Sequence, residues 1–378
     1  MEDLWFASAV WIGLALLASI ISIKLATSVV LVEIVMGAIA GNFIGLEPTP
    51  WVDFLAGFGA VLIIFLAGTE VDHTLVRSRI GRYAGLGVAS FLVPCLGTAA
   101  VARYALAWSW PASEIAGLAL SETSVAIVYT VLIEGRISRT EIGQTILAAS
   151  FVTNLCMILM LGVLFSRFDG TLAALGAATA FAMWAVPRLA RWSAPRLARS
   201  ISDPQFRFLA LILLALGGLA GLAHSEAVLP AYLLGLALSP VFATDRELNL
   251  RVRAIAFGLL TPFFFLKAGA LLDVRALGTA VPLVLAFAAL KVALKAAGVV
   301  PVAALYGTTG RERGFLALML STGLTFGNVV LLFGLANHHI DGAQYAALLS
   351  AIILTGLVPT VLAQRLFRPA STELRETP

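Results

Sequence analysis

The sequence predicts an all-α integral membrane protein with about 13 transmembrane helices, arranged as two inverted six-helix repeats with broken helices at matching positions. The first observation is composition: 60% of the 378 residues are hydrophobic and 12% are charged, whereas a soluble globular domain is about 45–50% apolar and about 25% charged. The second is that apolar runs of about 20 residues, each long enough to span a bilayer, recur along the whole chain. The third is that the basic residues gather in alternate connections between these runs.

The apolar runs define thirteen expected spans, joined mostly by short connections that Pro and Gly mark. These spans are residues 4–23, 26–46, 51–71, 83–108, 112–134, 142–166, 170–187, 206–223, 225–243, 254–272, 277–305, 314–336 and 343–364. The one longer linker, at about 188–205, follows the seventh span. It divides the chain into six spans, one connector and six more spans.

This division predicts a single transmembrane domain over residues 1–366. Its parts are a first repeat at about 1–167, a connector helix at about 168–205, a second repeat at about 206–366 and a cytoplasmic tail at 367–378. The chain starts with the acidic Met1-Glu2-Asp3, which differs from the basic start of a cleaved signal peptide, so we expect the first run to be a retained helix.

The basic residues predict the orientation in the membrane. If the N-terminus lies outside, most of the 25 Lys and Arg residues fall on the inner side. The outer side and its adjacent helix ends hold only Arg103, Arg167 and Arg275. Because basic residues are enriched in cytoplasmic loops, we expect an outer N-terminus and a cytoplasmic C-terminus.

Polar and Gly-rich stretches interrupt two spans at matching positions of the two halves. The fifth span of the first half contains residues 121–124, Ser-Glu-Thr-Ser, and that of the second half contains residues 321–328. Either stretch alone is typical of Ser and Thr side chains that bond back to their own helix. Two matching stretches instead indicate broken helices whose exposed backbone binds a transported ion. The expected backbone contributors are Ser121, Thr322, Gly323, Leu324 and Thr325.

Charged residues inside apolar spans are the other candidates, because an ionisable group at the bilayer centre costs about 2.5–3.5 kcal/mol on insertion scales. Glu122 lies near the middle of the fifth span, and its carboxylate can hold either a proton or a cation. The alternative is a protonated or paired structural Glu. Lys295 in the eleventh span is the candidate counter-charge, with a fixed salt bridge as the alternative. Lys291, one turn earlier, is interpreted as a snorkelling or packing residue.

Three further polar sites can be interpreted as structural rather than functional. For Glu70, near the inner membrane face, we expect a solvated or paired residue at a helix end, and for Glu33 a structural hydrogen bond. Thr153 and Asn154 in the sixth span offer oxygen ligands, and a hydrogen bond between helices is their alternative.

Soluble-enzyme chemistry finds no support in the sequence. None of the four histidines has metal-ligand spacing, and neither a Walker motif nor a dinucleotide fingerprint is present. We therefore expect no enzyme activity and no cofactor. Nucleic-acid binding is not expected either, since the basic residues are spread over short loops.

The chain resembles the bacterial monovalent cation:proton antiporters, the superfamily of sodium/proton exchangers and glutathione-gated potassium/proton antiporters. The most specific resemblance is residues 118–151, LALSETSVAIVYTVLIEGRISRTEIGQTILAASF, followed by residues 263–269, the paired lysines and residues 321–327. The resemblance implies a homodimer in the bacterial inner membrane, an elevator-like core domain, and fifth and twelfth spans that cross where they unwind. It also implies a buried Lys in the eleventh span, and Lys295 matches that position.

The sequence departs from this family where the resemblance implies an ion-binding carboxylate. The sixth-span motif of relatives usually ends in an essential Asp, and here it reads Thr153-Asn154. The residue before the Thr-Ser pair of the fifth span, often neutral in relatives, is Glu122. Three explanations stand: the charge has moved to Glu122, an engineered Asp-to-Asn change disables the site, or the protein is a natural relative without exchange activity.

The leading hypothesis is a secondary active transporter that exchanges Na⁺, or K⁺, for protons by alternating access. The alternatives are a non-transporting or disabled protein on this fold and a sodium-coupled organic anion transporter. The expected ion ligands are Glu122, Thr123, Ser124, Thr153 and Asn154, of which Glu122 and Asn154 would contact the metal ion directly, with Lys295 as counter-charge.

Overall fold

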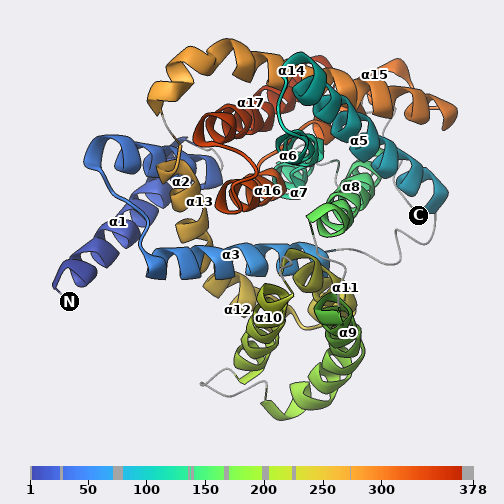
Figure 1. The fold of residues 1–378 in the computed structure, drawn as a ribbon. Coiled ribbons are helices and arrows are strands. Elements are labelled where there is room, and N and C mark those ends of the chain that lie inside the picture. The colour runs from blue at the N-terminus through green and yellow to red at the C-terminus, as the bar shows by residue number, and fades with distance from the viewer. Residues whose placement is uncertain are drawn as a thin grey trace. The chain divides into compact units, whose positions relative to one another are not determined.

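The computed structural model describes residues 2–25, 29–70, 80–134, 137, 140–165, 170–197, 204–223, 227–272 and 274–367. These residues form helices with short connections, and no β-strand occurs among them. Figure 1 shows the helices along the chain. They are α1 (Glu2–Leu25), α2 (Val29–Ile39), η1 (Ala40–Ile44), α3 (Pro50–Thr69), α5 (Ile80–Ala100), η2 (Val101–Ala105), α6 (Trp110–Ser121), α7 (Val125–Glu134), α8 (Glu141–Phe165), α9 (Gly170–Leu197), α10 (Pro204–Leu222), α11 (Val228–Thr244), α12 (Arg246–Ile255), η3 (Ala256–Leu260), α13 (Thr261–Ala270), α14 (Val274–Leu305), α15 (Gly310–Leu320), α16 (Thr325–Ala336) and α17 (Gly342–Leu366).

The described helices account for the thirteen expected spans. Ten segments are long and apolar enough to cross a membrane, and Val29–Ile44 and Val228–Thr244 are shorter apolar helices. The interrupted pair α6 and α7 supplies the remaining span, the fifth. The all-α membrane architecture predicted from composition and apolar runs is confirmed.

Two boundaries differ from the sequence prediction by more than a few residues. The linker expected at 188–205 is helical as far as Leu197, where α9 ends. The tenth span begins at Arg246 rather than 254. There α12 starts with a cap, in which Asp245 accepts a hydrogen bond from the backbone N–H of Leu248 at 2.9 Å.

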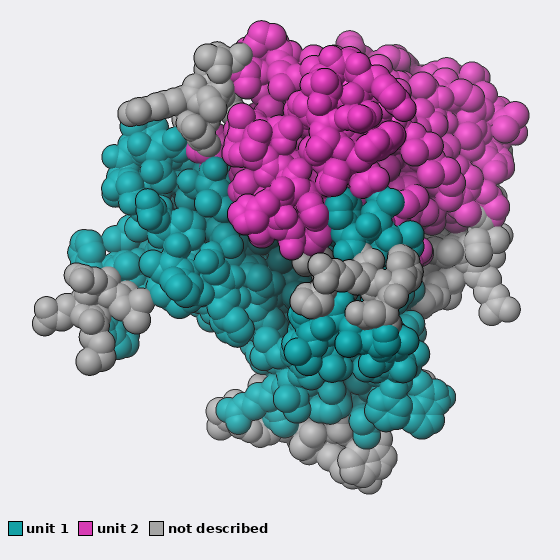
Figure 2. All heavy atoms as spheres, in the orientation of Figure 1, with its two compact units in different colours: residues 1–71, 161–271 teal, residues 72–160, 272–378 magenta. Residues whose placement is uncertain are grey.

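The chain divides into two compact units, coloured separately in Figure 2. Unit 1 comprises residues 1–71 and 161–271, and unit 2 comprises residues 72–160 and 272–378. Each six-span half contributes its first three spans to unit 1 and its last three to unit 2, and the connector α9 belongs to unit 1. This distribution is what two repeats of the same three-plus-three design produce.

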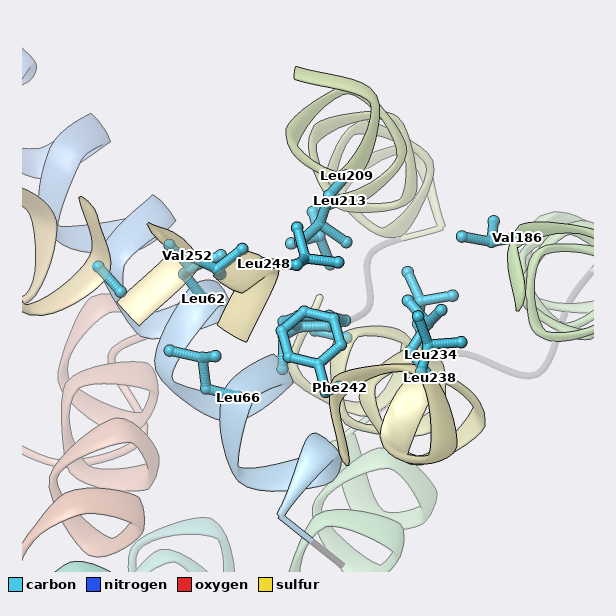
Figure 3. Packing of buried hydrophobic residues seen from close by; sticks show 14 of the residues in the cluster. Leu62, Leu66, Val186, Leu209, Leu213, Leu234, Leu238, Phe242, Leu248 and Val252 are labelled. Atoms are coloured by element: carbon cyan, nitrogen blue, oxygen red, sulfur yellow. The ribbon is translucent and has the colours of Figure 1, made fainter. Parts of the chain in front are cut away.

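Unit 1 has an apolar core where α3, α9, α10, α11 and α12 meet, seen from close by in Figure 3. Phe242 of α11 packs edge-on against Phe65 of α3, with ring centroids 5.5 Å apart. Glycines bring two helix pairs into backbone contact. Gly235 of α11 packs on the Phe65 carbonyl, and Gly269 of α13 packs on the Ile34 carbonyl of α2. Such close approach between small residues is typical of membrane helices.

Unit 2 contains the interrupted helices. Its apolar core joins α5, α7, α8, α14, α15 and α17 through buried residues such as Leu86, Val128, Ile146, Val299 and Leu316. The longest helix, α14, packs against α5 and α17. This core surrounds the ends of α15 and α7 next to the two interruptions, and so fixes where the unwound segments lie.

Candidate ion-binding site

Two interrupted helices meet in unit 2 at their interruptions. The helix α6 ends at Ser121 and α7 begins at Val125, while α15 ends at Leu320 and α16 begins at Thr325 (Figure 1). The backbone N–H of Ser124 in the first break donates to the carbonyl of Thr322 in the second at 2.9 Å. The expected pairing of broken helices in the fifth and twelfth spans is therefore confirmed.

Every polar group of Thr123 has a partner. Its hydroxyl donates to the Leu320 carbonyl at 2.7 Å and accepts from Lys295 Nζ at 2.9 Å. Its backbone N–H donates to Asn154 Oδ1 at 3.2 Å, and its carbonyl accepts from Asn154 Nδ2 at 2.9 Å. Thr123, Asn154 and Lys295 are all buried. The structure thus brings three of the predicted site residues together in one hydrogen-bonded group.

Lys295 is held by two hydroxyls. Its ammonium group donates to Thr123 Oγ1 and to Ser90 Oγ of α5, each at 2.9 Å. Ser90 is buried. Sequence reasoning missed it, because one Ser in an apolar span has no distinguishing pattern.

The other hydroxyls proposed as ligands bond mainly to nearby carbonyls. Thr153 Oγ1 contacts the carbonyls of Ala149 at 2.9 Å and of Gly87 in α5 at 3.1 Å. Ser121 donates to the Leu118 carbonyl and Thr322 to the Met319 carbonyl, at 2.7 and 2.8 Å. Ser124 Oγ accepts a long hydrogen bond of 3.5 Å from the Ile127 N–H, at the start of α7. These side chains fix the ends of the interrupted helices.

Glu122 differs from all of these. Its side chain is 0% exposed, and neither carboxylate oxygen has a hydrogen-bond partner among the described residues. The backbone N–H groups of Leu324 and Gly327, where α16 begins, lie toward the carboxylate. The N-terminal end of a helix carries a partial positive charge that favours a carboxylate. Glu122 therefore lies in a positive but incompletely bonded environment.

Lys291 is the second buried charged group without a hydrogen bond among the described residues. Its side chain is 0% exposed. Lys291 Nζ and Glu122 Oε1 converge on the point where a Cβ atom of Gly323 would stand. The interpretation of Lys291 as a snorkelling residue is wrong, because its ammonium group points to the interruption rather than to solvent. Its spacing of four residues from Lys295, on one helix face, was the available signal.

Asn328 is an uncharged residue whose buried side chain also lacks a hydrogen-bond partner among the described residues. It lies in the first turn of α16, is fully buried, and neither atom of its side-chain amide has a partner among the described residues. It follows Gly327, whose Cα faces the Glu122 side chain. Buried polar groups nearly always find a partner, so an amide without one next to Glu122 marks Asn328 as a candidate member of the site.

Two other candidates belong to unit 1. Glu33 of α2 is buried. Glu70 accepts a hydrogen bond from Arg253 of α12 at 2.6 Å, with both side chains about one-third exposed. The expectation that Glu70 is a paired residue at a helix end is confirmed.

A polytopic helical protein with paired, interrupted helices around buried charges has the architecture of a secondary transporter. A family model described as "Sodium/hydrogen exchanger, transmembrane" matches residues 12–368. The chain belongs to this family.

Individual relatives agree with the family match. The chain is 26% identical over 262 residues to "Probable Na(+)/H(+) antiporter 3" of Methanocaldococcus jannaschii, covering 66% of each chain. It is 22% identical over 368 residues to "Putative Na(+)/H(+) antiporter YjbQ" of Bacillus subtilis, covering 91% of this chain and 60% of that protein. The chain thus spans about two thirds or less of the length of these curated relatives.

The fold resembles a solved structure. The sodium proton antiporter MjNhaP1 from Methanocaldococcus jannaschii superposes with a TM-score of 0.72 at 16% sequence identity, covering 98% of this chain and 100% of that chain. At this identity the similarity establishes the fold, which is the sodium/proton antiporter fold.

Proposed function

We propose that the chain exchanges a monovalent cation, Na⁺ or K⁺, for protons across the membrane by alternating access. The observation that carries the proposal is the Glu122 carboxylate, which is fully buried at the pairing of two interrupted helices and has no hydrogen-bond partner among the described residues. Hard cations prefer oxygen ligands, and a carboxylate binds a proton and a cation in competition. Family membership and the names of the relatives support Na⁺ and protons as the substrates.

We assign roles according to whether each buried side chain already has hydrogen-bond partners. Glu122 is the shared carboxylate, and Lys291, which lies beside it without a hydrogen bond, is the counter-charge when no cation is bound. This replaces Lys295, whose ammonium group is engaged with Ser90 and Thr123. Asn328 offers an additional neutral oxygen.

The transport cycle follows from charge balance. Transferring an unpaired charge into the low-dielectric interior is costly. Glu122 is therefore paired with a protonated Lys291, or it is occupied by a cation or a proton while Lys291 has released its own proton and is neutral. Exchanging one occupant for another on opposite sides couples the two fluxes. With one carboxylate the site exchanges one proton per cation. A homodimer in a bacterial inner membrane is part of the proposal.

Proteoliposomes test the proposal through cation-induced proton flux, measured with an internal pH-sensitive dye after pulses of NaCl or KCl. We expect flux with the wild-type chain and none above empty liposomes with Glu122→Gln, which keeps the size but removes the charge. Glu114→Gln is the matched control, because Glu114 is a partly exposed residue of the same helix α6. Normal flux with Glu122→Gln contradicts the assignment of Glu122, and a silent wild-type chain contradicts exchange itself.

A further inference from the structure

Resting on the proposed function, we infer that Asn154 is a positioning residue that holds the unwound segment 122–124, and that it is not a ligand of the cation. The residue stands where relatives are expected to carry a carboxylate. In this chain the Asn154 amide group instead forms hydrogen bonds with the backbone of segment 122–124, which is not part of a helix.

The geometry of the Asn154 amide carries the first step. Its Oδ1 accepts from the Thr123 N–H at 3.2 Å and its Nδ2 donates to the Thr123 carbonyl at 2.9 Å. The side chain therefore pairs with both backbone groups of one residue, as a neighbouring peptide would. Glu122, with extended backbone angles of φ −62° and ψ 160°, follows the end of α6 and immediately precedes Thr123. Fixing Thr123 consequently fixes the direction in which the Glu122 side chain leaves the chain.

The chemistry of the amide carries the second step. This pairing needs one donor and one acceptor in the same side chain, and an amide has both, whereas an ionised carboxylate has acceptors only. An Asp at position 154 would accept from the Thr123 N–H but would place its second oxygen against the Thr123 carbonyl oxygen. The hydrogen bond would be replaced by repulsion between two buried acceptors. Asn154 is thus the residue that this backbone pairing requires, rather than a disabled Asp.

The surroundings of Thr123 carry the third step. Lys295 and the Leu320 carbonyl hold its hydroxyl from α14 and from the end of α15. With Asn154 of α8, three helices converge on one residue of the break. These groups are hydrogen-bonded to one another, while the side chains of Glu122, Lys291 and Asn328 have no hydrogen-bond partner within the described part of the chain. The buried polar residues therefore form two groups. The residues around Thr123 are hydrogen-bonded to one another, and Glu122, Lys291 and Asn328 remain available to interact with an ion.

Two measurements on the full-length chain test this role, with Asn154→Asp as the variant and Ser150→Ala as the control. Ser150 lies one turn earlier in α8, is buried, and donates to the Ile146 carbonyl of its own helix. The first measurement is hydrogen–deuterium exchange of peptides covering residues 119–132, in nanodiscs without added Na⁺ or K⁺. The loss of one buried hydrogen bond predicts exchange about tenfold faster in Asn154→Asp, and Ser150→Ala should match the wild type.

The second measurement is the KM for Na⁺ and for K⁺ in proteoliposomes. A displaced Glu122 predicts a KM about tenfold higher in Asn154→Asp, again the equivalent of one hydrogen bond, while an added ion ligand would lower the KM. Unchanged deuterium exchange at 119–132, or a lower KM, overturns the inference. If the wild-type chain shows no exchange of any cation, the proposed function fails, and the deuterium measurement still decides the role of Asn154.

Discussion

Gly323 is the residue at which the two unbonded charges come together. A Cβ atom there would collide with Lys291 Nζ and would lie 2.7 Å from Glu122 Oε1. Side chains at such distances must move. An alanine at position 323 would therefore displace the flexible ends of the Lys291 and Glu122 side chains.

This contact predicts the effect of Gly323→Ala. The added methyl group should separate Lys291 from Glu122 and lower the rate of cation-induced proton flux to the liposome background, with little loss of folded protein. Gly310→Ala is the matched control, because a Cβ at Gly310, in the same span, meets nothing within 4 Å. Flux and monodispersity on size exclusion are measured for both. Equal flux in the two variants would show that the space at Gly323 is not needed.

Residue types near the break were readable from the sequence, but their assignments to roles were not. Glu122, Thr123, Asn154 and Lys295 were all selected as candidates, and all four lie at the pairing of the broken helices. Lys291 is interpreted from sequence as a snorkelling or packing residue, because spacing along a helix does not say whether the ammonium group of a long side chain reaches water. Whether a buried polar side chain already has hydrogen-bond partners depends on neighbours from other helices, and this distinguishes Thr123 and Asn154 from Glu122.

At the scale of elements, proline and glycine determine how these helices pack and bend. Pro94 lies inside α5 four residues after Ser90, so the Ser90 carbonyl lacks its helical donor. The same residue supplies the hydroxyl that holds Lys295. In unit 1, Gly269 of α13 lets α13 contact the α2 backbone at Ile34 and Ala38.

The contact between α2 and α13 predicts the cost of Gly269→Ala. A methyl group there would meet the Ile34 carbonyl and lie 2.8 Å from the Ala38 nitrogen, and overpacking of this kind costs about 1–3 kcal/mol. We expect a lower melting temperature in detergent, measured by intrinsic fluorescence. Gly13→Ala in α1 should leave it unchanged, since its Cβ meets nothing within 4 Å. An unaltered melting temperature for Gly269→Ala would mean that the helices separate without penalty.

Helix positions were predictable because each span must hide its backbone polar groups within itself. The exceptions lie where a helix leaves the apolar stretch. The extension of α9 to Leu197 and the early start of α12 are charged, so hydropathy alone ended or began those spans elsewhere. In the fifth and twelfth spans the polar interruptions were visible as matching stretches, but their hydrogen bond between Ser124 and Thr322 needed both halves of the chain.

At the scale of the whole molecule, charge distribution predicts topology. The chain should place residue 2 outside and residue 375 inside. Single cysteines at these positions, in a background without Cys95 and Cys156, test this in intact cells: a membrane-impermeant maleimide should label position 2 only. Labelling of position 375 before cell lysis would contradict the orientation.

The amino-acid sequence by itself determined the membrane class, the thirteen spans and the matching interruptions, because these depend on composition and on local periodicity. Only the tertiary structure decided which buried polar groups bond to one another. It grouped three spans of each half into each unit, joined Asn154 and Lys295 to Thr123, and left Glu122 and Lys291 without hydrogen bonds among the described residues. The physical reason is that a hydrogen bond depends on distances of a few tenths of an ångström between residues far apart in the chain.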